Sequence, residues 1–371
     1  MDKHLHIISF DVPFPPDYGG AIDVFYKLKA LHEAGIKITL HCFEYGRGEK
    51  KELEKYCDAI FYYKRKANKH LLFNSLPYIV ASRRSEELVA NLLKDTSPIL
   101  FEGLHCCFHL NDERLRKRKK IVRMHNIEHT YYGNLASVEK SFFRKKYFER
   151  ESKKLEKFES ILKYADSVAA ISPADTYELN SRYKNAINIM AFHPHEKIEI
   201  KEGKGDFVLY HGSLAVGENN KAALYLVKEV FNDSNIPFVI AGNGASDELK
   251  EAVRNKKNIS LKENISTDEI YRMVQEAQIN ILPTFQATGI KLKLLSALSS
   301  GRHCIVNSLM VKDTGLESVC RIADSPGQMK KELALLMNKE FDSDEKIKRE
   351  KILLEKFSNR ANAVTLIELL F

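Results

Sequence analysis

Short apolar runs alternate along this chain with longer segments in which apolar residues recur at helical spacing. The first apolar run covers residues 4–10, a helical pattern follows at 21–34, and a second apolar run covers 36–43. Apolar runs of this length are typical of buried strands, and strands that alternate with helices predict a parallel sheet covered by helices. The chain is therefore expected to fold as an α/β protein.

The same alternation continues through the rest of the chain. Ser172 precedes Pro173 and Asp175, which favours the start of a helix at that point. We expect further strands at 59–63, 99–102, 120–124, 166–171, 207–211, 238–241, 259–261, 279–282, 304–306 and 319–323. We expect further helices at 85–93, 138–164, 222–231, 249–253, 270–277, 290–300 and 328–337, and a charged helix pair after them.

A polar stretch at 191–206, which contains Pro194 and Gly203, separates two groups of elements of similar size. We interpret this stretch as a linker. A chain of 371 residues is long enough for two ordinary domains. We therefore expect two doubly wound, Rossmann-like domains, 1–192 and 193–358, that face a cleft, with ligands beyond the carboxyl ends of the strands.

Residues 278–306 are the stretch with the clearest candidate chemistry. An apolar run ends at Pro283, a turn-like segment follows, and a helical pattern begins near Ile290. Such a loop suits phosphate, because free N–H groups and the helix dipole meet at a helix N-terminus. Lys291 and Lys293 add positive charge, but a separation of roughly 200° around a helix prevents both from pointing into one site. The alternative is an ordinary crossover with two solvated lysines.

Glycine turns follow or precede the early elements of both halves. Gly19 and Gly20 open the first helix, Gly212-Ser213 follows one strand of the second half, and Gly242-Asn243-Gly244 follows the next. Glycine lets the main chain approach a ligand closely, although a tight turn that needs positive φ is an equal alternative. No segment matches GxGxxG, so a dinucleotide site is only weakly indicated.

The net charge of +8 is unevenly distributed. Residues 114–123 hold seven basic residues in ten, including Arg116, Lys117, Arg118 and Lys119. Such a run can bind nucleic acid, but few aromatic residues interleave with it and no nucleic-acid-binding module is visible. A solvated loop is the simpler interpretation.

Six scattered cysteines form no CxxC pair, and no secretory pattern opens the sequence. These features predict free thiols in a reducing cytoplasm. No apolar run approaches the roughly 20 residues of a spanning helix, so any membrane contact is expected to be peripheral. His105, Cys106, Cys107 and His109 suggest a metal, but their spacing matches no known site and buried cysteine is the better interpretation.

Residues 125–129 fit H-x-x-E-H, the inverted zinc-peptidase motif. Zinc hydrolysis would need His125 and His129 on one helix face together with a third ligand. The segment follows a predicted strand directly and is expected to be a loop, which makes a zinc hydrolase a distant third candidate.

Several motifs together resemble those of a GT-B glycosyltransferase of the retaining family-4 type, also called group 1. They are the turn at Gly19-Gly20, the histidine His125 after a strand, the turn at 242–244 after FVIAG, and LSALSSG at 295–301, which is similar to the family's donor-binding motif. ADSVAAIS at 165–172 is similar to the strand before the family's domain crossover. The resemblance spans nearly the whole chain.

The resemblance implies transfer of a sugar from a nucleotide-sugar donor, with retention, to a glycan or lipid-linked acceptor. The second domain would hold the donor and the first the acceptor, with no cofactor and no metal. Lys293 would stabilise the charge that develops on the leaving diphosphate, and His125 would lie near the transferred sugar. Donor contacts would come from Gly19, Gly20, Gly212, Ser213, Gly242, Gly244, Thr288, Gly289, Ile290 and Ser296.

The sequence departs from the family pattern at three donor positions. Gln286-Ala287-Thr288 lacks the usual glutamate, Ser296 replaces the glutamate that binds the ribose, and His303 replaces the usual proline. A nucleotide-binding protein without transferase activity and a nucleotide-sugar epimerase are therefore the alternatives within this fold.

The resemblance also suggests a cellular setting, surface polysaccharide or glycolipid synthesis at the cytoplasmic side of a membrane. In that setting the basic run at 114–123 would attract anionic lipid, at ~1 kcal/mol per basic residue. No nucleic-acid partner is expected. A final helix at 359–371 is expected to pack back on the first domain, as in related chains.

Overall fold

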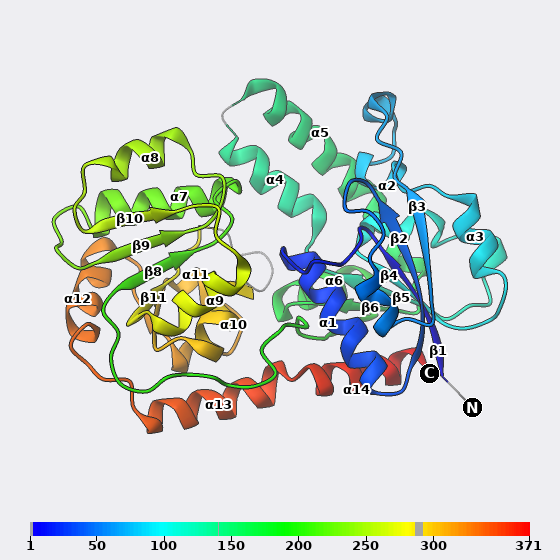
Figure 1. Cartoon of the computed structure of the whole chain (residues 1–371). Helices are drawn as coiled ribbons and strands as arrows, with labels where there is room; N and C mark the ends of the chain where they lie inside the picture. Colours follow the sequence, from blue (N-terminus) through cyan, green and yellow to red (C-terminus); the bar gives the residue numbers. More distant parts are fainter. Residues whose placement is uncertain (1–2, 140, 286–291) are drawn as a thin grey trace. The chain divides into compact units, whose positions relative to one another are not determined.

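The computed structural model describes residues 3–139, 141–285 and 292–371 of the chain (Figure 1). These residues form two compact units. The first comprises residues 3–194 and 357–371, and the second comprises residues 195–285 and 292–356. Each unit has one parallel sheet covered by helices, and each is considered by itself.

The first unit contains a parallel sheet in the order β3-β2-β1-β4-β5-β6-β7. Its strands are β1 (His4–Ser9), β2 (Lys37–Glu44), β3 (Ala59–Lys64), β4 (Ile99–Glu102), β5 (Lys120–Met124), β6 (Ser167–Ala170) and β7 (Ala186–Asn188). The order reverses between β1 and β4. Loops that leave the carboxyl ends of these two strands diverge, and ligands bind beside such a switch point in doubly wound sheets.

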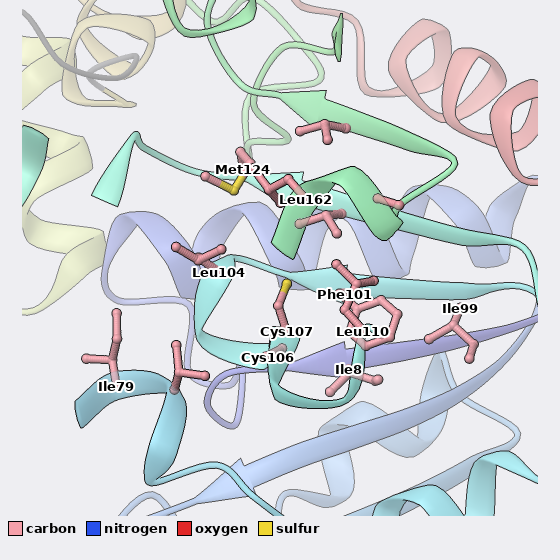
Figure 2. Close-up of a cluster of buried hydrophobic side chains, with 14 of the residues drawn as sticks. Ile8, Ile79, Ile99, Phe101, Leu104, Cys106, Cys107, Leu110, Met124 and Leu162 are labelled. Atoms are coloured by element: carbon pink, nitrogen blue, oxygen red, sulfur yellow. The ribbon is translucent and has the colours of Figure 1, made fainter. Parts of the chain in front are cut away.

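Helices cover both faces of this sheet. They are α1 (Gly19–Glu33), α2 (Tyr78–Ala81), α3 (Glu86–Leu92), α4 (Glu128–Val138), α5 (Phe142–Phe158), α6 (Pro173–Tyr183) and α14 (Asn359–Leu370). Helices α1 and α14 pack on one face, where Val24, Leu28 and Leu366 belong to one hydrophobic core. A second core, which contains Phe101 and Met124, lies on the other face (Figure 2).

Cys106 and Cys107 belong to this second core and are fully or almost fully buried (Figure 2). Both are free thiols. They lie on the short 3₁₀ helix Leu104–His109 and pack against Leu110 and Ile8, among other apolar side chains. Among the described residues they take part in no cluster that could hold a metal ion. The interpretation of these cysteines as core residues is confirmed.

The segment α14 completes the first unit although it lies far from the rest of that unit in sequence. Ser358 caps the helix by accepting a hydrogen bond from the Ala361 N–H at 3.3 Å. The side chain of Asn359 accepts a hydrogen bond from the His193 N–H and donates one to the His193 carbonyl oxygen, at 3.1 and 2.7 Å. Ala363, like Leu366, is buried in the core that α1 shares.

The second unit contains a parallel sheet in the order β10-β9-β8-β11-β12-β13, with its reversal between β8 and β11. The strands are β8 (Val208–His211), β9 (Phe238–Ala241), β10 (Ile259–Lys262), β11 (Ile279–Ile281), β12 (His303–Val306) and β13 (Arg321–Ile322). The helices are α7 (Gly217–Tyr225), α8 (Asp247–Arg254), α9 (Thr267–Glu276), α10 (Leu292–Ser300), α11 (Ser308–Val311), α12 (Pro326–Leu336) and α13 (Ser343–Phe357).

The helix expected at 138–164 is shorter than predicted, because α5 covers Phe142–Phe158 and a 3₁₀ helix, Glu159–Tyr164, follows it. The preceding helix α4 was not expected, and it packs against α5 as a hairpin (Figure 1). No glycine or proline lies in this stretch, so the sequence carries no strong stop signal. The loop expected at 125–129 is also wrong in part, because α4 begins at Glu128.

The basic run at 114–123 is not the solvated loop that was expected. Arg118 is 7% exposed and donates to the main-chain carbonyl oxygens of Asp95 and Ser97. Lys120 and Arg123 lie on β5 and are also buried. Three of the seven basic residues are therefore buried in internal contacts, and the other four are exposed.

Candidate functional site

Two glycine turns meet at the carboxyl ends of β8 and β9 in the second unit. The Gly212 N–H donates to the Ala241 carbonyl oxygen at 3.0 Å, and the Ala215 N–H donates to the Asn243 carbonyl oxygen at 3.1 Å. Gly242 has a φ of +154°, and a Cβ there would lie 1.8 Å from the carbonyl oxygen of Gly212. Only glycine permits this approach of the two main chains.

Lys293 stands in the first turn of α10 and reaches this pair of turns. Its ammonium donates to Oδ1 of Asn219 at 2.9 Å and lies 5.0 Å above the ring of Tyr210. The Asn219 amide in turn donates to the Ser213 carbonyl oxygen at 2.9 Å. A half-buried positive charge is thereby fixed between the end of β8 and the start of α7, next to the exposed Ser213.

The surroundings of Lys293 keep other positive charge away. His211, at the end of β8, is buried, and its burial, reinforced by the charge of Lys293, lowers its pKa to about 3. The imidazole is therefore neutral at physiological pH and adds no positive charge beside the ammonium. Thr284, after β11, donates its hydroxyl hydrogen bond to the Glu218 carboxylate in the first turn of α7.

The predicted donor contacts differ in how the structure places them. Gly212, Ser213, Gly242 and Gly244 come together at the two turns with Lys293. Ser296 lies on α10, is 4% exposed, and its hydroxyl finds no hydrogen-bond partner among the described residues. Residues 286–291, which include the predicted Thr288, Gly289 and Ile290 and the Lys291 side chain, lie outside the described residues.

His125 follows β5 in the first unit and is held by a buried carboxylate. Its Nε2 lies 3.0 Å from Oε2 of Glu102, and its Nδ1 lies 3.8 Å from Oδ2 of Asp23. The ring packs edge-on against Phe10 at 5.4 Å. Gly20 lies close by, because a Cβ at Gly20 would approach the Phe10 ring to 2.6 Å. His125 and the Gly19-Gly20 turn are thus brought to the same side of the sheet.

A buried network of charges fixes this carboxylate. The Lys27 ammonium donates to Asp23 at 2.9 Å and to Glu102 at 2.7 Å. Arg123 forms a two-point contact with Asp23, at 3.2 and 2.8 Å. Burial raises the pKa of Glu102, but Lys27 and His125 together outweigh burial and lower the net pKa. Glu102 therefore stays ionised and orients the imidazole of His125.

This buried charge network was not predicted from the sequence, although the spacing of two charged residues indicates it. Asp23 and Lys27 are spaced i and i+4 on the same face of the first helix as Val24 and Leu28. Charged residues on an apolar face are almost never buried unless they are paired. This spacing therefore pointed to a buried partner on the sheet.

The ligand atoms of Asp23, Glu102 and His125 lie close enough to hold a metal ion. Lys27 and Arg123 already supply the positive charge between the two carboxylates, so a cation is not needed there. The two histidines of the H-x-x-E-H motif also bind different carboxylates: His129 lies 2.9 Å from Glu159. His129 joins no candidate metal cluster in the part of the chain that the structure describes.

Comparison with known proteins agrees with this architecture. Residues 205–338 match the family model described as "Glycosyl transferases group 1". A 44.6-kDa protein in the cps region of Klebsiella pneumoniae is 27% identical over 331 residues, which cover 83% of this chain and 84% of that protein.

Solved structures resemble the chain over its whole length. Sucrose-phosphate synthase from Thermosynechococcus elongatus has a TM-score of 0.73 at 14% identity, with 99% of this chain and 98% of that chain covered. TarM has a TM-score of 0.73 at 12% identity, with 100% and 99% covered. Residues 205–338 therefore resemble the group 1 glycosyl transferases, and the chain as a whole has the GT-B fold.

Proposed function

We propose that this protein transfers a sugar, with retention, from a nucleotide-sugar donor to a glycan or lipid-linked acceptor. The observation that carries the proposal is the Lys293 ammonium, which Asn219 fixes beside the glycine turns after β8 and β9. A fixed cation of this kind stabilises the charge that develops on a leaving diphosphate. Main-chain N–H groups at the start of α7 add to the attraction for phosphate.

The relatives support the proposed classes of donor and acceptor. A structure of TarM from S. aureus contains UDP together with alpha-GlcNAc-glycerol and Fondaparinux, and its chain is 11% identical to this one, with 99% of each chain covered and a TM-score of 0.72. The Klebsiella relative is a protein of a cps region. We infer a role in surface polysaccharide or glycolipid synthesis on the cytoplasmic side of the membrane, where nucleotide sugars serve as donors.

In the first unit, His125 is the side chain proposed to lie against the transferred sugar. Glu102 holds it through Nε2 and the Phe10 ring supports its face. Gly19 and Gly20, at the start of α1, are proposed as further donor contacts. No metal takes part in the proposed mechanism, because Lys293 supplies the charge that a divalent cation would otherwise supply.

A thermal-shift screen against UDP, GDP, ADP and their sugar conjugates, with and without EDTA, tests the donor half of the proposal. A ligand at 100 times its dissociation constant adds about 2.7 kcal/mol to the free energy of unfolding. We expect a shift with one nucleotide family that EDTA does not change. No shift with any of these nucleotides would refute a donor site in the second unit.

Transfer and its alternatives are separated by incubating the protein with the identified donor. An epimerase converts the sugar of the donor without an acceptor, whereas a transferase needs an acceptor for efficient turnover. A protein that only binds nucleotide shows the thermal shift but no product in either case. NMR of the product's anomeric proton then reports whether configuration is retained.

A further inference from the structure

The first unit contains a cavity of about 610 Å³ at the carboxyl ends of β1, β2 and β3. Its size suits a sugar or a short glycan. Three arginines and three tyrosines are prominent in its lining, namely Arg47, Arg65, Arg83, Tyr18, Tyr45 and Tyr132. All residues that line the cavity belong to the first unit.

Arg83 is built into the wall of this cavity. It is 4% exposed, and it donates to the main-chain carbonyl oxygens of Phe10 at 2.9 Å and Ile79 at 2.6 Å. Among the described residues it forms no ion pair with a carboxylate. Burial lowers its pKa to about 10, so the guanidinium remains charged at neutral pH. A fixed and uncompensated positive charge thus lies in the wall of the cavity.

Tyrosine rings position the other two guanidinium groups. Arg65 lies 4.3 Å above the ring of Tyr45, and its Nε donates to the Ser82 hydroxyl at 3.0 Å. Arg47 lies 5.4 Å above the ring of Tyr18. It also pairs with the half-exposed carboxylate of Asp17 at 3.0 Å. Stacking on an aromatic face holds a guanidinium in place without neutralising it.

The acidic and imidazole groups in the lining do not balance this charge. Asp11 is the carboxyl in the wall, and burial raises its pKa while Tyr18 and the Val12 N–H donate to it. Burial holds the pKa of His105 well below its usual range, with Arg83 as a further cause, so His105 is neutral. The lining therefore holds three cations and one carboxyl, while Asp17, outside the lining, pairs with Arg47.

We propose that this cavity binds the acceptor through an oxyanion that the acceptor carries, a phosphate or a sugar carboxylate. The proposal rests on the proposed glycosyl transfer and names the class of acceptor. Arg65 and Arg83 face the oxyanion, since planar guanidinium groups match phosphate and carboxylate in a two-point geometry. The exposed rings of Tyr18 and Tyr45 offer apolar faces to the sugar.

Calorimetric titration with three probes tests this assignment: glucose 1-phosphate, glucuronate and methyl glucoside. All titrations use a Lys293→Ala background, which weakens phosphate binding at the proposed donor site. We expect at least one of the two charged probes to bind about tenfold or more tightly than methyl glucoside. Tighter binding of glucose 1-phosphate identifies phosphate as the recognised group, and tighter binding of glucuronate identifies the carboxylate.

Arg65→Gln and Arg84→Gln form the matched pair of variants. Arg65 is half-buried in the cavity wall, whereas Arg84 is exposed, lies over Phe108 and does not line the cavity. Arg65→Gln should weaken binding of the charged probe about tenfold, and Arg84→Gln should leave it unchanged. Equal effects of the two variants, or equal binding of all three probes, would overturn the proposal.

The thermal-shift screen with nucleotides separates this inference from the proposed function. If the wild-type protein binds a nucleoside diphosphate but the cavity shows no preference for a charged probe, the acceptor inference fails and the transferase proposal stands. If no nucleotide binds, the transferase proposal fails first. Arg83→Gln can unfold the first unit because Arg83 is buried, so Arg65→Gln carries the decision.

A second observation concerns the end of the α4–α5 hairpin. The α4 and α5 ends nearest the turn present Val138, Phe142 and Phe143, which are 42%, 67% and 83% exposed. Exposed basic side chains follow directly on α5, at residues 144–146. Apolar side chains beside a basic cluster are the combination by which peripheral proteins bind anionic bilayers.

We infer that this hairpin end, rather than residues 114–123, contacts an anionic membrane. In the described part of the chain, no helix has the length and apolar character that crossing a bilayer requires. The two phenylalanines would enter the headgroup region. Lys145 would contact lipid phosphates, as would Arg144 and Lys146 on exchanging their partners Glu139 and Glu149 for lipid. Adjacent exposed phenylalanines are otherwise unfavourable in water.

Flotation with liposomes of phosphatidylglycerol and phosphatidylcholine tests this contact. The double variant Phe142→Ser/Phe143→Ser should lose most binding, and Phe73→Ser, which removes another exposed phenylalanine, should not. Wild-type binding should vanish on pure phosphatidylcholine or at high salt. Unchanged flotation of the double variant would overturn the inference. A double variant that loses self-association would also overturn it, because the patch would then be an interface between two copies of the chain.

Discussion

Replacing Asp23 by alanine would test the buried charge network most directly. Asp23 is fully buried and accepts hydrogen bonds from Lys27, Arg123 and the Phe192 N–H. Burial raises its pKa, but Arg123 and Lys27 outweigh this effect and hold the pKa well below its usual value. Without the carboxylate, Arg123 keeps only the carbonyl oxygens of Ile189 and Met190 as partners.

The expected cost follows from the burial of both partners. Removal of one partner from a buried ion pair destabilises a protein by about 3–5 kcal/mol. For a unit of this size, each kcal/mol lowers the melting temperature by about 2–4 °C. Asp23→Ala should therefore lower the first-unit transition by about 6–20 °C in differential scanning calorimetry.

Glu113→Ala is the matched control, because Glu113 pairs with Arg116 at 3.8 Å while both side chains are more than four-fifths exposed. An exposed pair of this kind contributes at most about 1 kcal/mol. Asp23→Ala/Arg123→Met should recover part of the loss, since it removes the uncompensated guanidinium. Similar melting temperatures for Asp23→Ala and Glu113→Ala would refute the reasoning.

Three further predictions concern single side chains. Lys293→Ala should weaken nucleoside-diphosphate binding by about 1.5–3 kcal/mol in calorimetry. Lys228→Ala, which removes an exposed ion pair in the same unit, should leave this binding unchanged. Equal effects of the two variants would argue against a phosphate contact at Lys293. Gly242→Ala should lower the melting temperature of the second unit and abolish nucleotide binding because its Cβ meets the Gly212 carbonyl oxygen, while Gly217→Ala, whose Cβ has open space, should be tolerated. Burial raises the pKa of Glu128 to about 8, so the folded state holds a proton there that the unfolded state releases above a pH of about 4.5. The contribution of Glu128 to the free energy of unfolding is therefore present below that pH and falls as the pH rises to 8. Glu128→Gln should flatten this part of the profile of urea-unfolding free energy against pH. An unchanged slope would contradict the raised pKa.

Much of the fold could be predicted because its strands are buried on both faces. A strand such as 99–102 is then a continuous apolar run whose bounds are visible in the sequence, and the helix start at Ser172 is confirmed, since its hydroxyl accepts the Asp175 N–H at 3.1 Å. The GT-B fold class is confirmed as well. Helix α4 was missed, because residues 125–129 were expected to form a loop and the next helix was expected to begin only at 138.

The candidate sites were less predictable, because they depend on pairs of residues far apart in sequence. Lys293 and Asn219 are 74 positions apart, and Arg123 and Asp23 are 100 apart. Local patterns indicate which residue type stands at each position but not which distant partner it meets. The basic run at 114–123 shows the same limit, because a charge count cannot distinguish Arg118, which is bound to carbonyl oxygens inside the unit, from its exposed neighbours.

The position of α14 has a consequence for synthesis of the protein. Residues 3–194 leave the ribosome first, yet their core lacks Ala363, Leu366 and Leu370 until all of the second unit has been translated. Domains commonly fold as units during synthesis. Here the second unit can form its sheet while the first still exposes the apolar groove that α14 fills. The first unit therefore completes its core only after the second unit has been translated.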